Sequence, residues 1–311
     1  MNPIIYFISP GHQNLPELTA YLDYCLQHDI EAYSVSYTFD FSQERRRIVK
    51  WYFMGMPPLL PIKDKKNIIV YEYLSLSTGK ISNIKDVIKR LYSLKADLCI
   101  YLNDAVKTKL SFPFNVKNIA YRDMGVSELF LHYINKNEKK YDFVYCGALD
   151  EEREIDSLLN NFVNGKLRNY TILIIGEKKD YLNSFSDFDN ITFIGKVPYS
   201  EVPGYLSLAR CAINFIPNKR PYNIQTSTKL LEYISLRMPV LSTKYAWVSD
   251  FQHKYNAPIL FFDEALSTKA IDQFLNGTVH IYPDMSEFSW ETIISNSRVF
   301  DTILEKFNRS L

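Results

Sequence analysis

Residues 223–243 read NIQTSTKLLEYISLRMPVLST, a helix pattern followed by a strand pattern. Ser227 or Thr228 can cap the helix, because a side-chain oxygen there accepts a hydrogen bond from a free backbone N–H of the first turn. Residues 228–236 are expected to be helical, and the apolar residues 240–242 are expected to form the strand. Helices that alternate with buried strands predict a parallel sheet covered by helices.

The same alternation extends outward in both directions. Several strand segments are apolar at consecutive positions, which indicates burial on both faces. The expected strands are residues 4–8, 32–37, 67–71, 98–102, 143–146, 171–175, 191–194 and 212–216. The expected helices are residues 15–27, 43–54, 84–94, 155–162, 202–209 and 289–306.

A polar segment at residues 135–140, NKNEKK, interrupts the pattern and predicts a domain boundary. The expected domains are residues 1–136 and 141–285, with a closing segment at 286–311. The predicted fold class is α/β, with two Rossmann-like doubly wound domains facing a central cleft. In such sheets ligands bind at the carboxyl ends of the strands.

Composition excludes several classes of protein. The 311-residue chain has a net charge of +1, which gives no case for nucleic-acid binding. No apolar run has the ~18 residues of a membrane span, and the N-terminus has no signal-peptide pattern. The four cysteines are far apart and form no metal-binding pattern, so we expect free thiols in a reducing cytosol and no metal. The expected location is the cytosol or the inner face of the plasma membrane.

The start of the helix at residue 228 has the features of a diphosphate site. A helix N-terminus offers free N–H groups and partial positive charge, and Lys229 adds a full charge there. Glu232 lies on the same side of the helix, where its carboxylate can accept hydrogen bonds from ribose hydroxyls. A surface Lys–Glu pair on an ordinary amphipathic helix is the equally weighted alternative.

Two other strand ends carry candidate ligand contacts. Gly147 ends a buried strand, and Arg153 follows where its forked donors can meet a distal phosphate. Gly195 ends another strand, and the loop through Val197 can present backbone groups to a nucleobase. The competing interpretations are a solvated charge for Arg153 and a plain turn for the loop.

In this order and spacing, the three stretches resemble the nucleotide-binding domain of GT-B glycosyltransferases, especially glycosyltransferase family 4. The segments 147–149 and 152–154 stand in register with the family's Gly-Arg-Leu and Glu-Lys-Gly, and residues 191–197 match its Val-x-Phe-x-Gly-x-Val. Arg153 then replaces a phosphate-binding lysine. Ala148 replaces an arginine, so one phosphate contact is missing.

The resemblance also assigns roles around residue 228. Glu232 matches the second of the family's two carboxylates, whereas Ile224 stands in the place of the first. The triplet 227–229 resembles the Pro-Thr-Lys of a family branch in which the hydroxyl and the lysine hold the diphosphate. The segment from residue 288 resembles the last helix of the family, which crosses back to the first domain. The resemblance implies a nucleotide-sugar donor, with UDP-sugar favoured, and no other cofactor.

The first half is expected to hold the acceptor. Candidate catalytic groups are polar residues at strand ends: His12, Glu72 and Asp104. An inverting transferase needs one such group to take a proton from the acceptor hydroxyl. A retaining enzyme need not use any of them as a base. Glu72 follows the expected strand 67–71 directly, which would present it to the cleft.

A basic stretch within residues 43–66 has seven cationic and two acidic residues, a local charge of +5. Cations mixed with aromatic residues are typical of helices that bind anionic membranes, and a lipid-linked acceptor would explain them. A helix with one solvated and one buried face is the alternative. The candidate membrane-surface residues are Arg45, Arg46, Arg47, Lys50 and Trp51.

The function that these observations favour is transfer of a sugar from a nucleotide-sugar to a glycan or lipid-linked acceptor, in bacterial surface polysaccharide or glycolipid synthesis. A sugar-nucleotide epimerase of the same fold and a non-catalytic binding subunit remain alternatives. A Rossmann oxidoreductase is disfavoured, because no GxGxxG follows a strand. The sugar, base, acceptor, stereochemistry and oligomeric state stay open.

Overall fold

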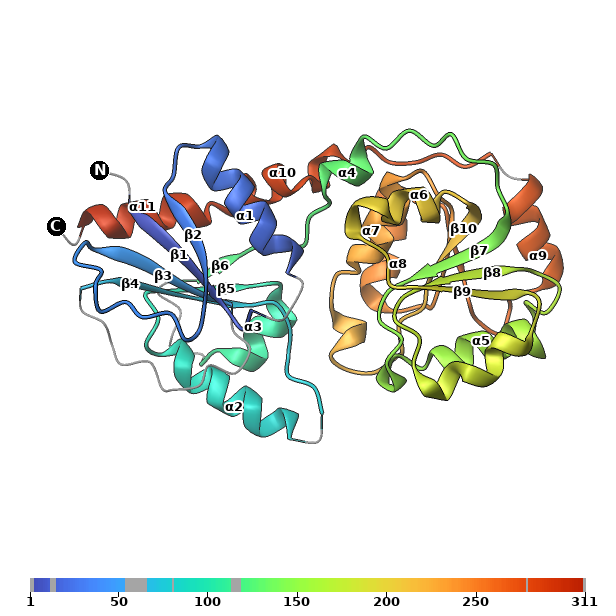
Figure 1. The fold of residues 1–311 in the computed structure, drawn as a ribbon, viewed down its shortest axis with the longest axis horizontal. Coiled ribbons are helices and arrows are strands. Elements are labelled where there is room, and N and C mark those ends of the chain that lie inside the picture. The colour runs from blue at the N-terminus through green and yellow to red at the C-terminus, as the bar shows by residue number, and fades with distance from the viewer. Residues whose placement is uncertain are drawn as a thin grey trace. The chain divides into compact units, whose positions relative to one another are not determined.

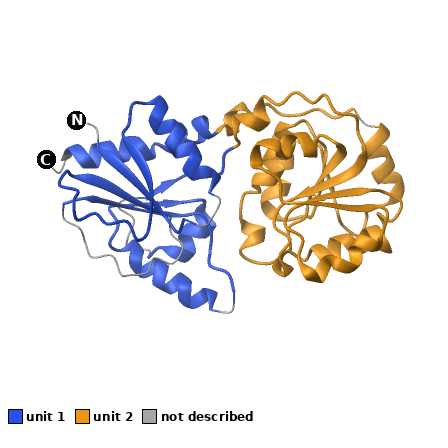
Figure 2. Cartoon of the chain, in the orientation of Figure 1, with its two compact units in different colours: residues 1–125, 290–311 blue, residues 126–289 orange. Residues whose placement is uncertain are grey.

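The computed structural model describes residues 3–11, 15–53, 66–79, 81–112, 119–277 and 279–309. The chain divides into two compact units, residues 1–125 with 290–311, and residues 126–289 (Figure 2). Each unit is built on a six-stranded sheet whose strands all pair in parallel. The predicted fold class, two Rossmann-like α/β domains, is confirmed.

Unit 1 has the strand order β2-β1-β3-β4-β5-β6. Its strands are β1 (Ile4–Ser9), β2 (Ala32–Ser36), β3 (Ile48–Phe53), β4 (Ile68–Tyr73), β5 (Leu98–Tyr101) and β6 (Ile119–Tyr121). Helix α1 (Pro16–Gln27) covers one face together with α10 (Trp290–Ser297) and α11 (Val299–Arg309), and these three share one core cluster. Helices α2 (Ser82–Ser93) and α3 (Asp104–Leu110) lie on the other face (Figure 1).

Unit 2 has the strand order β12-β11-β10-β7-β8-β9. Its strands are β7 (Tyr141–Cys146), β8 (Ile172–Ile175), β9 (Ile191–Gly195), β10 (Ala209–Asn214), β11 (Val240–Ser242) and β12 (Ile259–Phe261). Its helices are α4 (Glu128–Leu131), α5 (Ile155–Val163), α6 (Val202–Leu206), α7 (Thr228–Ser235), α8 (Ala246–Tyr255) and α9 (Thr268–Asp272) (Figure 1).

The strand order of unit 2 creates a binding position. From β7 the chain builds outward through β8 and β9, and then returns to place β10 on the other side of β7. Such a reversal separates the connections that leave the two central strands, and leaves a crevice at their carboxyl ends. Helix α7 follows β10, so its N-terminus belongs to this end of the sheet.

The division between the units falls earlier than the polar segment 135–140 predicts. Residues 126–134 pack with unit 2, because Val126 donates a backbone hydrogen bond to Phe288 (2.7 Å) and the hydroxyls of Tyr133 and Ser207 lie 3.3 Å apart. The polar composition of residues 135–140 identified only the exposed part of this connection, and residues 126–134, which pack with unit 2, gave no such signal. The last two helices belong to unit 1.

The predicted helix over residues 43–54 is wrong, because β3 occupies Ile48–Phe53. This strand lies between β1 and β4 in the sheet. Val49, Trp51 and Phe53 alternate along it and point into the core beneath α1 and α11, where each is at most 3% exposed. Burial in the sheet outweighs a helical reading of the sequence. No helix in the described ranges is long and apolar enough to cross a membrane.

Candidate functional site

Helix α7 begins with a cap that is tied to the sheet. Ser227 accepts a hydrogen bond from the backbone N–H of Leu230 (3.2 Å) and donates one to Asn214 at the end of β10 (2.7 Å). Asn214 in turn donates to the Ser242 hydroxyl at the end of β11 (2.9 Å). The Ser227 hydroxyl is therefore buried and occupied, and it positions the helix start. Thr228, the first residue of α7, is partly exposed.

Lys229 lies in the first turn of α7 and reaches back to the end of β7. Its ammonium group donates a hydrogen bond to the Tyr145 hydroxyl (3.0 Å) and lies 4.5 Å from the centre of that ring. Gly147 has a φ of +151°, and a Cβ at this position would collide with the end of the Lys229 side chain. The glycine thus makes room for the cation. Within the described residues, no carboxylate pairs with Lys229.

The backbone is also tightly packed where β7, β8 and β9 end. The N–H of Gly147 donates to Ile175 and that of Gly176 to Gly195, each at 2.9 Å. A Cβ at Gly176, whose φ is +157°, would collide with the carbonyl of Gly147. Gly195 ends β9 with a φ of +78°, and Val197 follows it partly buried. The loop has the position that the sequence predicts, and its contact with a base stays a prediction.

Arg153 lies in a short 3₁₀ turn after β7, with its guanidinium 4.3 Å from the centre of the Tyr222 ring. The Tyr222 hydroxyl donates to Glu152 (2.7 Å), and Lys219 pairs with Glu154 (2.7 Å). These contacts join the loop after β7 to the loop after β10. Arg153 is partly exposed and has no ion pair among the described residues, so its charge is available to an anion.

Glu232 lies one turn after Lys229 and accepts a hydrogen bond on Oε1 from the Tyr199 hydroxyl (2.7 Å). Burial raises the pKa of its carboxyl to about 7, while the Tyr199 hydrogen bond and the Lys229 charge oppose that rise. In the parts of the chain that the structure describes, Oε2 has no hydrogen-bond partner, so one carboxylate oxygen is open to a ligand.

The predicted residues of unit 2 thus fall at one end of its sheet. Three tyrosines there were missed by sequence reasoning: Tyr145, Tyr199 and Tyr222. The sequence contains a weak indication of Tyr145, since it lies two residues before the turn at Gly147. The other two come from loops whose partners lie far away in the sequence, and no local pattern indicates them.

The catalytic candidates of unit 1 have different surroundings. His12 lies outside the described residues. Asp104 is the first residue of α3, is exposed, and accepts a hydrogen bond from Tyr121 (2.5 Å). Asp104 therefore lies just past the end of β5, as expected, and its role as a base stays a prediction.

Glu72 does not follow the strand as expected, because β4 continues to Tyr73. Its side chain is 1% exposed and is paired with Arg122. It also accepts hydrogen bonds from the indole N–H of Trp51 (2.7 Å) and from Tyr21 (3.3 Å). A carboxylate enclosed by three donors is placed to hold the core of unit 1 together and is not presented to an acceptor.

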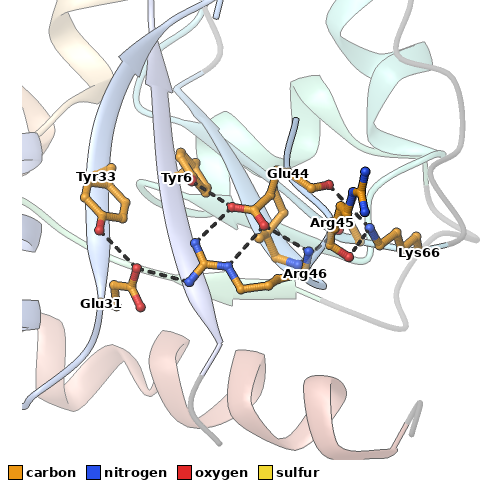
Figure 3. Close-up of polar contacts among 9 residues, drawn as sticks. Tyr6, Glu31, Tyr33, Glu44, Arg45, Arg46 and Lys66 are labelled. Atoms are coloured by element: carbon orange, nitrogen blue, oxygen red, sulfur yellow. Dashed lines mark hydrogen bonds and ion pairs between the residues drawn. The ribbon is translucent and has the colours of Figure 1, made fainter. Parts of the chain in front are cut away.

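In the described part of the basic stretch, residues 43–53, a turn leads into β3, and the side chain of Arg46 has protein partners (Figure 3). Arg46 pairs with Glu44 (3.0 Å) and Glu31 (3.5 Å), and its hydrogen bonds lower the pKa of Glu44 to about 2. Arg47 donates to the Phe307 carbonyl (2.6 Å).

Two further members of the predicted membrane surface differ from the expectation. Trp51 is wholly buried in the core, so its assignment to that surface is wrong. Lys50 is partly buried, with its ammonium 4.7 Å from the centre of the Phe41 ring. Arg45 is exposed, and its carbonyl accepts a hydrogen bond from Lys66 (2.6 Å; Figure 3). The amphipathic helix on which the membrane hypothesis rested is absent from residues 48–53.

Comparisons with known proteins agree with the fold. Residues 140–276 match the family model described as glycosyl transferases group 1. By sequence, no curated protein matches the chain. Among solved structures, AviGT4, a glycosyltransferase involved in avilamycin A biosynthesis, is 11% identical with a TM-score of 0.60, over 99% of this chain and 98% of that one.

Two other solved structures give similar values. Anabaena Alr3699/HepE in complex with UDP-glucose is 10% identical with a TM-score of 0.61, over 99% of this chain and 100% of that one. WaaG, a glycosyltransferase involved in lipopolysaccharide biosynthesis, is 12% identical with a TM-score of 0.54, over 98% of both chains. The predicted resemblance to GT-B enzymes is confirmed. The chain has the GT-B fold of these enzymes, and residues 140–276 in its second unit match the glycosyl transferases group 1 family model.

Proposed function

We propose that unit 2 binds a nucleotide-sugar donor, with UDP-sugar favoured, at the end of its sheet where α7 begins. The observation that carries this proposal is Lys229, a cation in the first turn of α7 with no carboxylate partner among the described residues. It adds a full charge at the helix end that already attracts anions. Alr3699/HepE, which has the same fold, has been solved in complex with UDP-glucose.

Each residue then has a separate task in the reaction. The bond between the anomeric carbon and the diphosphate breaks, a bond to the acceptor oxygen forms, and the acceptor hydroxyl loses its proton. Lys229 and Arg153 stabilise the charge that develops on the leaving diphosphate. The open oxygen of Glu232 accepts from the ribose hydroxyls. Gly147 keeps the strand end free of a side chain where Lys229 lies.

The acceptor is proposed to be a glycan or a lipid-linked sugar bound by unit 1, as in synthesis of a bacterial surface polysaccharide or glycolipid. A cytosolic reaction fits the four cysteines, which are all free. Attachment to the inner face of the plasma membrane has weaker support than the sequence suggests, because Arg46 and Arg47 bind within the protein.

The direct test is to incubate the purified chain with UDP-sugars, with and without glycan acceptors, and to measure released UDP. We expect release that depends on an acceptor and that Lys229→Ala strongly reduces. Conversion of the donor sugar without UDP release would instead identify an epimerase. Binding of UDP with no turnover for any acceptor would support a non-catalytic subunit. No binding of any nucleoside diphosphate, measured by thermal shift, would contradict the proposal.

A further inference from the structure

We propose that Tyr199 is a positioning residue that orients Glu232 for the ribose of the donor, an inference that rests on the donor site proposed above. Its hydroxyl donates to Oε1 of Glu232 at 2.7 Å, which is a normal length for a hydrogen bond from a hydroxyl to a carboxylate. Tyr199 begins the 3₁₀ turn ahead of α6, whereas Glu232 lies on α7. The bond therefore links the turn before α6 to helix α7, two separate parts of unit 2.

The tyrosine ring is itself held in place. Phe130, wholly buried in α4, packs against it with ring centres 5.4 Å apart and ring planes at 50°. Helix α4 packs against α7, so the ring and the carboxylate that it contacts are braced by the same element. The contact with Phe130 restricts the orientation of the Tyr199 ring, and in this orientation the hydroxyl points toward Glu232.

The bond leaves the carboxylate with one oxygen occupied and one open. A carboxylate held at one oxygen loses rotational freedom before the ligand arrives, which lowers the cost of ordering it on binding. The bond also favours the ionised form, because a hydroxyl donates best to a charged acceptor. Burial pushes the pKa of Glu232 up to about 7, and Tyr199 limits that rise. The negative form is the better acceptor for two ribose hydroxyls.

The alternative is that Tyr199 only stabilises the loop. The chain offers a matched control in unit 2, because Tyr170 donates to Asp272 at the same distance of 2.7 Å. Asp272 lies on helix α9, not on α7. Tyr170→Phe removes a hydrogen bond of the same length from the same kind of pair, together with a longer bond to the Thr268 carbonyl (3.4 Å). A loss of UDP affinity in Tyr199→Phe that exceeds the loss in Tyr170→Phe is therefore an effect on Glu232.

The test measures Kd for UDP and for pyrophosphate by calorimetry at several pH values between 6 and 9, on full-length protein. Because one hydrogen bond contributes about 0.5–1.5 kcal/mol, Tyr199→Phe should weaken UDP about 2- to 12-fold at pH 7. The pH at which UDP affinity reaches its plateau should move upward, since the pKa of Glu232 rises when the donor is lost. Pyrophosphate binding should not change, and Tyr170→Phe should leave both ligands unaffected.

A double-mutant cycle decides whether Tyr199 acts through Glu232. In a Glu232→Gln background, Tyr199→Phe should have little further effect on UDP. Equal losses in both backgrounds, an equal loss of pyrophosphate affinity, or no loss at all would overturn the inference while leaving the donor site intact. If Glu232→Gln itself leaves UDP binding unchanged, the ribose role fails and this inference fails with it. If the wild-type protein binds no UDP, the proposed donor is wrong.

Discussion

Two glutamates, one in each unit, show how the same side chain can serve structure or ligand binding. Glu72 in unit 1 is enclosed by Arg122, Trp51 and Tyr21, and all of these donors come from the protein core. Glu232 in unit 2 has one tyrosine donor, an open oxygen and a lysine one turn away. A carboxylate whose partners are complete holds a fold together. One whose partners are incomplete at a strand end is available to a substrate.

The comparison predicts its largest effect at Arg122. Arg122→Met removes the cation and leaves the Glu72 charge buried without its partner, which typically costs 3–5 kcal/mol. Urea unfolding should show a loss of about that size in the free energy of unfolding. The control is Arg210→Met, because Arg210 pairs with the partly exposed Asp142 at 3.4 Å and should cost much less. Equal losses in the two variants would contradict a special role for the buried pair.

A third carboxylate, Glu17, is expected to make the free energy of unfolding depend on pH. Burial raises its pKa to about 7, although Arg122 opposes the rise. Between the unfolded pKa of 4.5 and about 7, the folded state holds a proton that the unfolded state releases, so this group lowers stability as pH rises. Glu17→Gln lacks that loss. The difference in unfolding free energy, variant minus wild type, should therefore increase by about 2–3 kcal/mol from pH 5 to pH 7.

Urea titrations of the Glu17→Gln variant and the wild type at both pH values test this difference. A constant difference across that range would contradict the assigned pKa. It would leave the Arg122 prediction untouched, because that prediction concerns one fixed pH.

The binding counterpart of these changes concerns Lys229 and Arg153, the two cations of the proposed donor site. Lys229→Ala or Arg153→Ala should each weaken nucleoside diphosphate binding by about 1–3 kcal/mol, the scale of a lost charged hydrogen bond. The unfolding free energy without ligand should hardly move, since both side chains are partly exposed. Calorimetric titration gives the affinities, and undiminished binding in both variants would remove these residues from the donor site.

The smallest effect is expected on the surface of unit 1. Replacing Arg45, Arg46 and Arg47 by Ser breaks the exposed pair of Arg46 with Glu44, and such pairs contribute about 0–1 kcal/mol each. It also removes the Arg47 contact with Phe307. We expect a slight loss of stability and little change in vesicle binding.

Co-sedimentation with vesicles of anionic and of neutral lipid distinguishes the two uses of these arginines. If they bind membranes, the triple variant should lose about 1 kcal/mol of vesicle affinity per charge, and only for anionic lipid. That result would restore the membrane hypothesis without its helix.

Sequence reasoning succeeded where periodicity and strand-end glycines carry the signal. The α/β fold of the two units and the elements around Gly147 and Lys229 follow from local patterns of apolar residues. The prediction failed for residues 48–53. Their mixture of basic and aromatic residues fits an amphipathic helix as well as a central strand whose residues alternate between two faces. The prediction also failed for Glu72, since the strand ends two residues later than expected and so turned an apparent strand-end acid into a core residue.

The remaining contacts could not be read from the sequence for a different reason. Tyr199 and Glu232 are 33 residues apart, and Glu72 and Arg122 are 50 residues apart. Each pair meets only after the sheet has assembled, and one sequence has no local feature that links its members. Partners of a buried charge are therefore the part of a site that a structure adds.

Hydrogen–deuterium exchange with and without UDP tests the position of the donor site, because it shows which backbone segments the ligand protects. A donor site at this end of the sheet predicts slower exchange at the N-terminus of α7, residues 227–230, and in the loop of residues 147–153. Protection there should be lost in Lys229→Ala at the same UDP concentration. Protection confined to unit 1, or unchanged exchange at residues 227–230 in a protein shown to bind UDP, would contradict a donor site at the end of the second sheet.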